Sequence, residues 1–147
     1  MEKCTAVLDD YGIGHEIGVM SAHRAPDLVH EYATSARARG IRVLIGAAGA
    51  AAALPGVLAS LTTLPVIGVP LNATPLNGFD SLMSIVQMPP GIPVATVAVG
   101  DMGARNAAHL AAQIIAVADP EVAAAIDRVR AKMRDGVQLP AGFAAAR

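Results

Sequence analysis

The sequence predicts an α/β protein, with a doubly wound parallel sheet covered by helices in a three-layer arrangement. Segments with helical periodicity alternate with short apolar runs, and no linker or long repeat divides the 147 residues. Hydrophobic residues make up 54% of the chain, but aromatic residues only 3%. The apolar side chains are therefore mostly small or aliphatic, which suits helices that pack closely against a sheet.

Charge and composition exclude several classes of protein. The formal net charge is −1, from 11 basic and 12 acidic residues without a basic stripe, so nucleic-acid binding has no electrostatic support. Gly and Pro interrupt every apolar run before the roughly 18 residues that a membrane helix needs. Neither a secretory signal after Met1 nor a disulfide partner for Cys4 is present. We therefore expect a cytoplasmic protein that binds neither nucleic acid nor membranes.

The first part of the chain predicts a helix, a strand and a second helix. Residues 1–11 place Cys4, Leu8 and Tyr11 on one helical face, and Gly12 ends that helix. Residues 15–20 are expected to form a short strand. Pro26 is suited to the first turn of a helix that continues to Gly40. Its expected inward positions are Leu28, Val29, Tyr32, Ala33 and Ala36.

The rest of the chain predicts three more strands and four more helices. The strands are expected at residues 41–45, 64–69 and 94–99, and the helices at 54–61, 80–86, 103–116 and from 119 onward. Asp80 and Asp119 are the expected caps of two of these helices. The last helix carries an apolar stripe of Val122, Ile126, Val129 and Met133. We expect an α/β domain over residues 1–118 and a C-terminal helix and tail over 119–147, with no pattern after Gly136.

The alternation begins with a helix, although a doubly wound domain normally opens with a strand whose following loop binds phosphate. That strand would lie in the middle of the sheet, so its absence would leave neighbouring strands with unpaired backbone groups. We therefore expect either that residues outside this sequence supply the strand or that a neighbouring chain completes a rearranged sheet. In either arrangement the ligand site should lie at the carboxyl ends of the strands, in the loops after residues 20, 45, 69 and 99.

Several strings in a fixed order resemble one known family. Ser21-Ala22-His23-Arg24 follows a predicted strand, and Gly49-Ala50-Ala51-Ala52-Ala53-Leu54 runs into Pro55-Gly56. The segments 64–70, 76–89, 91–100 and 103–107 continue the match. Together they resemble the class I N5-carboxyaminoimidazole ribonucleotide mutases, the PurE family, over about residues 1–118. The resemblance implies a flavodoxin-like fold and a homo-oligomer, an octamer, whose contacts involve the helix from Gly103 and the C-terminal segment.

The chain departs from this family at three places. The family's opening strand and Gly-Ser-x-Ser-Asp loop, which would hold the phosphate and ribose, have no counterpart before Met1. Ala53 stands where the family usually has a second histidine, and Ala25 where threonine is usual. These departures leave open a catalytically impaired or specialised paralogue, either a decarboxylase or a scaffold, as the alternative to a mutase.

The resemblance implies a mutase that converts N5-carboxyaminoimidazole ribonucleotide to the 4-carboxy isomer in purine (IMP) biosynthesis. A nucleotide is the substrate, CO2 is released and recaptured as an intermediate, and no metal or organic cofactor is required. The enzyme must hold CO2 close to the ring carbon and exclude water. A relative that carboxylates aminoimidazole ribonucleotide with CO2 directly, or a generic nucleotide-binding module, would explain fewer of the strings.

His23 is the candidate catalytic residue, because an imidazole can exchange protons near neutral pH and a strand is expected to end just before it. The alternative for His23 is a structural hydrogen bond. Arg24 could bind a phosphate bidentately or form a surface ion pair. Ser21 could bind substrate or cap the following helix. Ala22, the next residue, is also a candidate substrate-binding residue. The other candidate substrate-binding residues are Gly49, Ala50, Ala51 and Leu54. Their loop could instead serve helix–sheet packing alone.

His15, His30 and His109 lack metal-ligand spacing and are interpreted as structural or solvated.

Overall fold

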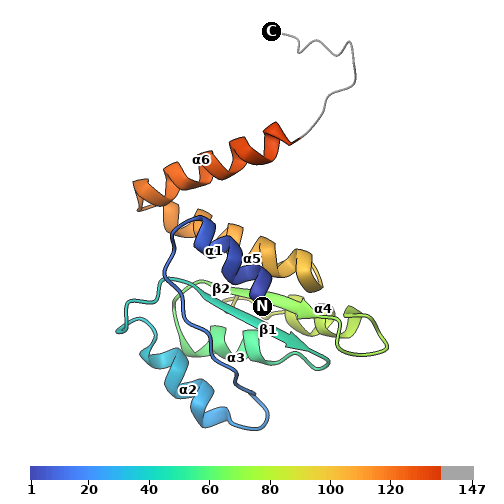
Figure 1. The fold of residues 1–147 in the computed structure, drawn as a ribbon. Helices are drawn as coiled ribbons and strands as arrows, with labels where there is room; N and C mark the ends of the chain where they lie inside the picture. The colour runs from blue at the N-terminus through green and yellow to red at the C-terminus, as the bar shows by residue number, and fades with distance from the viewer. Residues whose placement is uncertain (137–147) are drawn as a thin grey trace.

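The computed structural model describes residues 1–136, and the predicted tail after Gly136 lies outside them. The predicted α/β fold is confirmed: three parallel strands are flanked by helices on both faces (Figure 1). In chain order the elements are α1 (Glu2–Asp10), α2 (Pro26–Ser35), β1 (Leu44–Gly49), α3 (Leu54–Leu61), β2 (Val66–Leu71), α4 (Phe79–Val86), β3 (Ala95–Thr96), α5 (Gly100–Ala116) and α6 (Pro120–Asp135).

The sheet has the order β1-β2-β3, with all pairs parallel. β1 pairs with β2 over its whole length, from Leu44 opposite Val66 to Gly49 opposite Leu71. β3 is short and pairs with β2 only at Ala95 and Thr96. β2 is therefore the central strand of these three, and its first five residues are all buried, as expected for a parallel strand covered on both faces.

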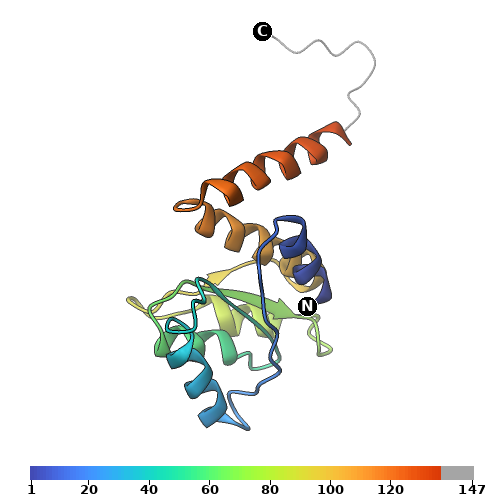
Figure 2. The same ribbon diagram turned by 60° about the vertical axis from the view of Figure 1, so that its left-hand side comes forward.

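Two layers of helices enclose the sheet. α1 and α5 lie together on one face, while α2, α3 and α4 lie on the other. α6 follows α5 after a tight turn and extends away from the sheet, packing against α5 (Figure 2). No helix among residues 1–136 is both long enough and apolar enough to span a bilayer.

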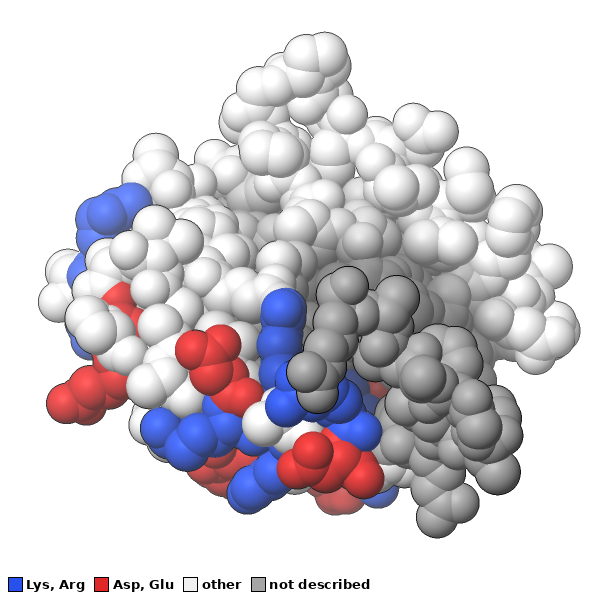
Figure 3. All heavy atoms as spheres, turned by 90° about the horizontal axis from the view of Figure 1, so that it is seen from above, with Lys and Arg blue, Asp and Glu red and all other residues white. Residues whose placement is uncertain are grey.

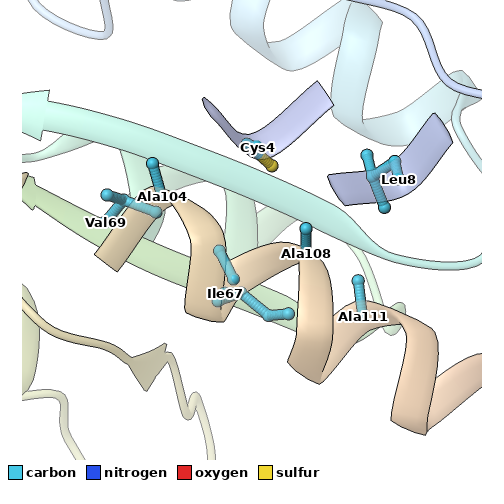
Figure 4. Close-up of a cluster of buried hydrophobic side chains, with 8 residues drawn as sticks. Cys4, Leu8, Ile67, Val69, Ala104, Ala108 and Ala111 are labelled. Atoms are coloured by element: carbon cyan, nitrogen blue, oxygen red, sulfur yellow. The ribbon is translucent and has the colours of Figure 1, made fainter. Parts of the chain in front are cut away.

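The core between the sheet and α5 consists of aliphatic side chains from β2 and small side chains from the helix (Figure 4). Ile67 and Val69 are fully buried against Ala104, Ala108 and Ala111. Cys4 and Leu8 of α1 join the same cluster. The alanines allow α5 to approach the strands closely, which is the packing that the alanine-rich composition predicted.

The predicted strand at residues 15–20 is wrong. The segment is extended but belongs to no sheet, and Ile17 is 66% exposed while Val19 is fully exposed. Its backbone finds no strand to pair with in the described chain, and a strand needs a partner for its N–H and C=O groups. Residues 15–20 are therefore extended but form no strand with the described residues.

Other boundaries move by a few residues. β1 begins three residues later than predicted, and the strand expected at residues 94–99 is paired only over Ala95–Thr96. α2 ends at Ser35, with turns up to Gly40, and α5 begins three residues early, at Gly100. Leu28 of α2 is exposed instead of inward, whereas Val29 and Ala33 are buried as expected. Helix ends are set by local hydrogen bonds that periodicity does not report.

One of the two predicted caps is confirmed. The Asp119 side chain accepts a hydrogen bond from the Val122 N–H at 3.3 Å and caps α6. The prediction for Asp80 is wrong, because the N-cap of α4 is Gly78, with φ of 87°, and Asp80 lies in the first turn without capping. On α6, Val122, Ile126 and Val129 pack inward as predicted, but Met133 is about half exposed.

Candidate active site

The string Ser21-Ala22-His23-Arg24 forms a hydrogen-bonded turn that leads into α2. The Ala25 N–H donates to the Ser21 carbonyl at 2.9 Å, and the Arg24 N–H approaches the Ser21 carbonyl and Oγ at 3.3 Å each. Ser21 therefore stabilises the turn, while the N-cap position of α2 is Ala25, which makes no side-chain cap. Pro26 then begins the helix with its fixed φ, as predicted.

This turn lies at the carboxyl end of the sheet. α2 precedes β1 and returns the chain to the start of that strand, so the amino end of α2 lies near the end to which β1 points (Figure 1). The side chains of His23 and Arg24 are exposed, and within residues 1–136 neither forms a side-chain hydrogen bond or an ion pair. Both groups are thus free to meet a ligand.

The loop after β1 is the second part of the candidate site. Ala50 has φ of 54°, a left-handed conformation that is uncommon for a residue other than glycine, and the Ala52 N–H donates to its carbonyl at 2.8 Å. Ala51 is exposed, while Leu54 is half-buried as the first residue of α3. At Gly49 a Cβ atom would lie 2.8 Å from the Ala73 Cβ, so only glycine permits this close approach to the loop after β2.

The loops after β2 and β3 meet at Asn72, a residue that the sequence analysis did not single out. A Cβ on Gly78 would lie 3.4 Å from the Asn72 Cα, and one on Gly100 would lie 3.6 Å from the Asn72 Oδ1. Both glycines have positive φ, 87° and 71°. Asn72 follows the last residue of β2 directly, so its position after a predicted strand was the signal that could have identified it.

Asp80, in the first turn of α4, lies beside the loop after β2. Its Oδ2 accepts a hydrogen bond from Thr74 Oγ1 at 2.8 Å, but its Oδ1 is buried without a partner in the described chain. The Ser84 hydroxyl donates to the Asp80 carbonyl at 2.8 Å and lies 3.5 Å from the Ala50 carbonyl. These contacts connect the start of α4 with the loop after β1.

Two surface hollows lie away from this edge. One, of about 380 Å³, is lined between α5 and α6 by residues that include Gln113, Ile126 and Arg130. The other, of about 410 Å³, includes Arg37 and Thr63, which precede β1 and β2 and so lie toward the opposite end of the sheet. His23 lines neither of these two hollows, and its side chain is exposed.

The remaining histidines occupy structural or solvated positions. His109 Nδ1 lies 2.6 Å from the Tyr11 hydroxyl, and desolvation, with a smaller effect of Arg130, lowers the pKa of His109. His15 lies 3.8 Å from an Asp9 carboxylate oxygen, and His30 is exposed. Among residues 1–136 no group of three or more His, Cys, Asp or Glu side chains could hold a metal ion.

Comparison with known proteins identifies the family. The sequence profile described as AIR carboxylase matches residues 1–136. The chain belongs to the AIR carboxylase family. The match extends into α6, beyond the domain boundary expected at residue 118.

Relatives in this family are similar over most of their length. The chain is 53% identical over 134 residues to an N5-carboxyaminoimidazole ribonucleotide mutase of Pyrococcus abyssi, covering 91% of this chain and 76% of the relative. It is 50% identical over 137 residues to a protein of the same name from Vibrio cholerae, covering 93% and 85% respectively. Treponema denticola PurE, a solved structure, superimposes with a TM-score of 0.82 at 27% identity, covering 91% of this chain and 82% of that one.

Proposed function

We propose that this chain is an N5-carboxyaminoimidazole ribonucleotide mutase, which moves a carboxylate from the exocyclic nitrogen to the ring carbon of its substrate. The observation that carries the proposal is the identity of 53% to a relative with that name over 91% of the chain. The exposed turn with His23, at the end of the sheet where ligands of such folds bind, supports it. The impaired or specialised paralogue is not favoured by the comparisons.

The proposed chemistry needs one proton carrier and no net change in protonation. The carbamate C–N bond breaks, CO2 leaves, and His23 in its protonated form donates a proton to the nitrogen. The enamine-like ring carbon then attacks CO2 and forms the new C–C bond. The neutral His23 imidazole accepts the proton that this carbon loses, so the residue returns to its starting state. Retention of CO2 beside the ring makes recapture faster than escape.

The residues around His23 are proposed to position the nucleotide. Arg24, next to His23 in the same turn, has a free guanidinium group that can bind a phosphate bidentately. The Ser21 hydroxyl and the backbone groups of Ser21 and Ala22 are proposed to contact the substrate beside His23. The loop of small residues after β1 is proposed to hold the migrating carboxylate or CO2 with backbone N–H groups, and its members are Gly49, Ala50, Ala51 and Leu54.

We also propose that the protein is cytoplasmic and that its chains assemble, as an octamer, to enclose this open site. An exposed apolar stripe along α4 supports assembly: Phe79, Met83 and Val86 follow one another at helical spacing, and Met102 at the start of α5 is 70% exposed. Between Val43 and Gly100 the only charged residue is Asp80. Figure 3 accordingly shows charged side chains gathered on one side of the visible face and none over a large remaining part.

The test is an activity assay of the purified protein with N5-carboxyaminoimidazole ribonucleotide as substrate, in which formation of the 4-carboxy product is measured. We expect activity without bicarbonate, and a loss of roughly 10²-fold or more in kcat for His23→Asn. His30→Asn, which changes an exposed histidine farther along α2, is the matched control and should retain activity. Strict dependence on bicarbonate with aminoimidazole ribonucleotide as substrate would instead identify a carboxylase. Light scattering should give eight times the chain mass of 14.9 kDa.

A further inference from the structure

The loops at the carboxyl ends of β1, β2 and β3 contain no basic side chain. Between Val43 and Gly100 there is no Lys, Arg or His, and the only charged residue is Asp80. The substrate and the product of the proposed reaction each carry a carboxylate in addition to the phosphate. Wherever these loops contact that carboxylate, neutral hydrogen-bond donors must therefore hold it.

The side-chain hydroxyls in the loop after β2 and in α4 already donate to protein acceptors. Thr74 Oγ1 donates to the Asp80 carboxylate at 2.8 Å. Ser81 Oγ donates to the Leu71 carbonyl at 2.8 Å, and Ser84 Oγ donates to the Asp80 carbonyl at 2.8 Å. A hydroxyl has one proton to donate, so these three groups can offer a carboxylate no further donor.

The remaining neutral donors among the side chains of residues 43–100 are three amides, on Asn72, Asn77 and Gln87. Asn72 follows the last residue of β2 directly, so it lies at the carboxyl end of the central strand. Asn77 lies farther along the same loop, in a left-handed conformation with φ of 52°. Gln87 follows the last residue of α4, the helix that returns the chain toward the amino end of the sheet. Asn72 is therefore the amide that the fold places where ligands of such sheets bind.

The amide of Asn72 is open to a ligand. The residue is exposed, and its side chain makes no hydrogen bond within residues 1–136. Gly78 and Gly100, both with positive φ, lie beside it. A Cβ on Gly78 would lie 3.4 Å from the Asn72 Cα, and one on Gly100 would lie 3.6 Å from the Asn72 Oδ1. Glycine at these two positions leaves the space beside the amide free of side-chain atoms.

The loop after β1 connects Asn72 with the turn that carries His23. At the start of this loop, a Cβ on Gly49 would lie 2.8 Å from the Cβ of the residue that follows Asn72. At the end of the loop, Leu54 packs against the same cluster of α2 and α3 as Met20, which precedes the turn. Adjacent strands lie about 4.8 Å apart, so a carboxylate held on the loop after β1 is within reach of the end of β2.

We propose that Asn72 is a specificity-determining residue, whose carboxamide recognises the carboxylate of the nucleotide together with the amine nitrogen beside it. This inference rests on the mutase function proposed above. A carboxamide presents an NH2 donor and a carbonyl acceptor side by side. In the 4-carboxy product, a carboxylate acceptor and an amine donor lie on adjacent ring carbons. In the N5-carboxylated substrate, the carboxylate and the N–H belong to one carbamate, which offers the same pair.

This role changes discrimination between nucleotides, because aminoimidazole ribonucleotide has the ring, the ribose and the phosphate but no carboxylate. The test measures the affinity of the full chain for this nucleotide and for the 4-carboxy product by titration calorimetry at neutral pH. Asn72→Asp replaces the NH2 donor with a charged acceptor. We expect it to weaken product binding by about 30-fold and aminoimidazole ribonucleotide binding by less than about threefold. In turnover, the same variant should raise KM for the N5-carboxylated substrate more than it lowers kcat.

Asn77→Asp is the matched control, because it adds the same charge to the same loop at another exposed position. It should change neither affinity by more than about twofold, since an exposed charge is screened by water and salt. Asn72→Ala removes the amide without adding a charge and should weaken product binding by about tenfold. This variant decides the question if Asn72→Asp does not fold.

The outcomes separate this inference from the proposed function. Equal weakening of both nucleotides in the Asn72 variants would overturn the specificity role, because a general disturbance of the loop has that effect. Wild-type turnover together with an unchanged product affinity in both variants would reject Asn72 and retain the mutase function. If the wild-type chain bound neither nucleotide, the mutase function would fail, and the role of Asn72 with it.

Discussion

The hydroxyl of Tyr11 and Nδ1 of His109 lie 2.6 Å apart, which joins the end of α1 to the middle of α5. Their rings meet edge to face, with centroids 5.6 Å apart and an interplanar angle of 80°. Tyr11 also packs with Ala112 of α5 and Ala125 of α6. The pair thus lies where three helices meet, although the two residues are far apart in the sequence. Burial raises the pKa of Tyr11, so its hydroxyl stays protonated, and the tautomer of His109 sets which of the two groups donates the hydrogen bond.

We predict that Tyr11→Phe lowers the free energy of unfolding by about 1 kcal/mol, because it removes the hydrogen bond and leaves Nδ1 of His109 without its partner. Urea unfolding followed by circular dichroism measures this change. In a double-mutant cycle with His109→Leu, the two effects should sum to more than the effect of the double variant. Strict additivity would mean that the two side chains do not interact in solution.

The pH dependence of stability should carry a contribution from His109. Desolvation first, and Arg130 of α6 second, lower its pKa below the usual 6.5, while Asp10 of α1 opposes the shift. The unfolded state then binds the proton more readily than the folded state, so stability is complete above the unfolded pKa and is lost as the pH falls through the folded pKa. We expect the urea midpoint to decrease as the pH is lowered from about 8 to about 5. His109→Leu should reduce this slope, and an unchanged slope would contradict the prediction.

The sequence predicted the helices of this fold better than the strands of its sheet. Helix periodicity and glycine or proline boundaries located α1, α3 and α6 within a residue or two. Residues 15–20 were predicted as a short strand, but pairing depends on another strand that local sequence does not contain. Asp80 was predicted as a cap because its type favours that position. Gly78 occupies it instead, through a left-handed conformation that allows close packing on Val99.

The loop after β1 was predictable because a loop follows each parallel strand, whereas the turn of Ser21 to Arg24 follows a segment that is not paired in the sheet. The exposed turn of Ser21 to Arg24 and the left-handed Ala50 both lie in the expected loops. Asn72 was not singled out because it lacks a motif, although it follows β2 directly, and its place beside Gly78 and Gly100 is visible only in the structure. The Tyr11–His109 contact could not be predicted either, since it joins helices whose relative position depends on the whole sheet.

Gly103 is predicted to tolerate no side chain. A Cβ atom there would lie 1.6 Å from the Ala98 carbonyl oxygen and 2.6 Å from its carbon, so backbone atoms would have to move. Gly103→Ala should lower the free energy of unfolding by about 3 kcal/mol. Gly14→Ala is the control, because no atom lies within 4 Å of the methyl group that this change adds, and stability should change by less than about 0.5 kcal/mol. Equal stabilities of the two variants would show that α5 does not approach Ala98 this closely.

Arg24 should affect substrate binding without affecting stability. Its guanidinium group is exposed and has no partner within the described residues, so Arg24→Gln should change the free energy of unfolding by less than about 0.5 kcal/mol. If it binds the substrate phosphate, KM should rise by roughly 10- to 100-fold. Arg24→Lys should recover part of the loss, because lysine keeps the charge but not the bidentate geometry. Arg37→Gln, which removes a hydrogen bond to Thr63, is the control and should leave KM unchanged. An unchanged KM in Arg24→Gln would exclude the phosphate role.

The thiol of Cys4 should report opening of α1. Cys4 is only 2% exposed and packs against α5, and burial raises its pKa, so both access and thiolate formation are restricted. We expect a disulfide reagent to modify the native chain far more slowly than the urea-unfolded chain. Tyr11→Phe should accelerate the native reaction about fivefold, which corresponds to the loss of about 1 kcal/mol that holds α1 to α5. A native rate equal to the unfolded rate would contradict the buried position of Cys4. An unchanged rate in Tyr11→Phe would mean that α1 opens without breaking the contact with His109.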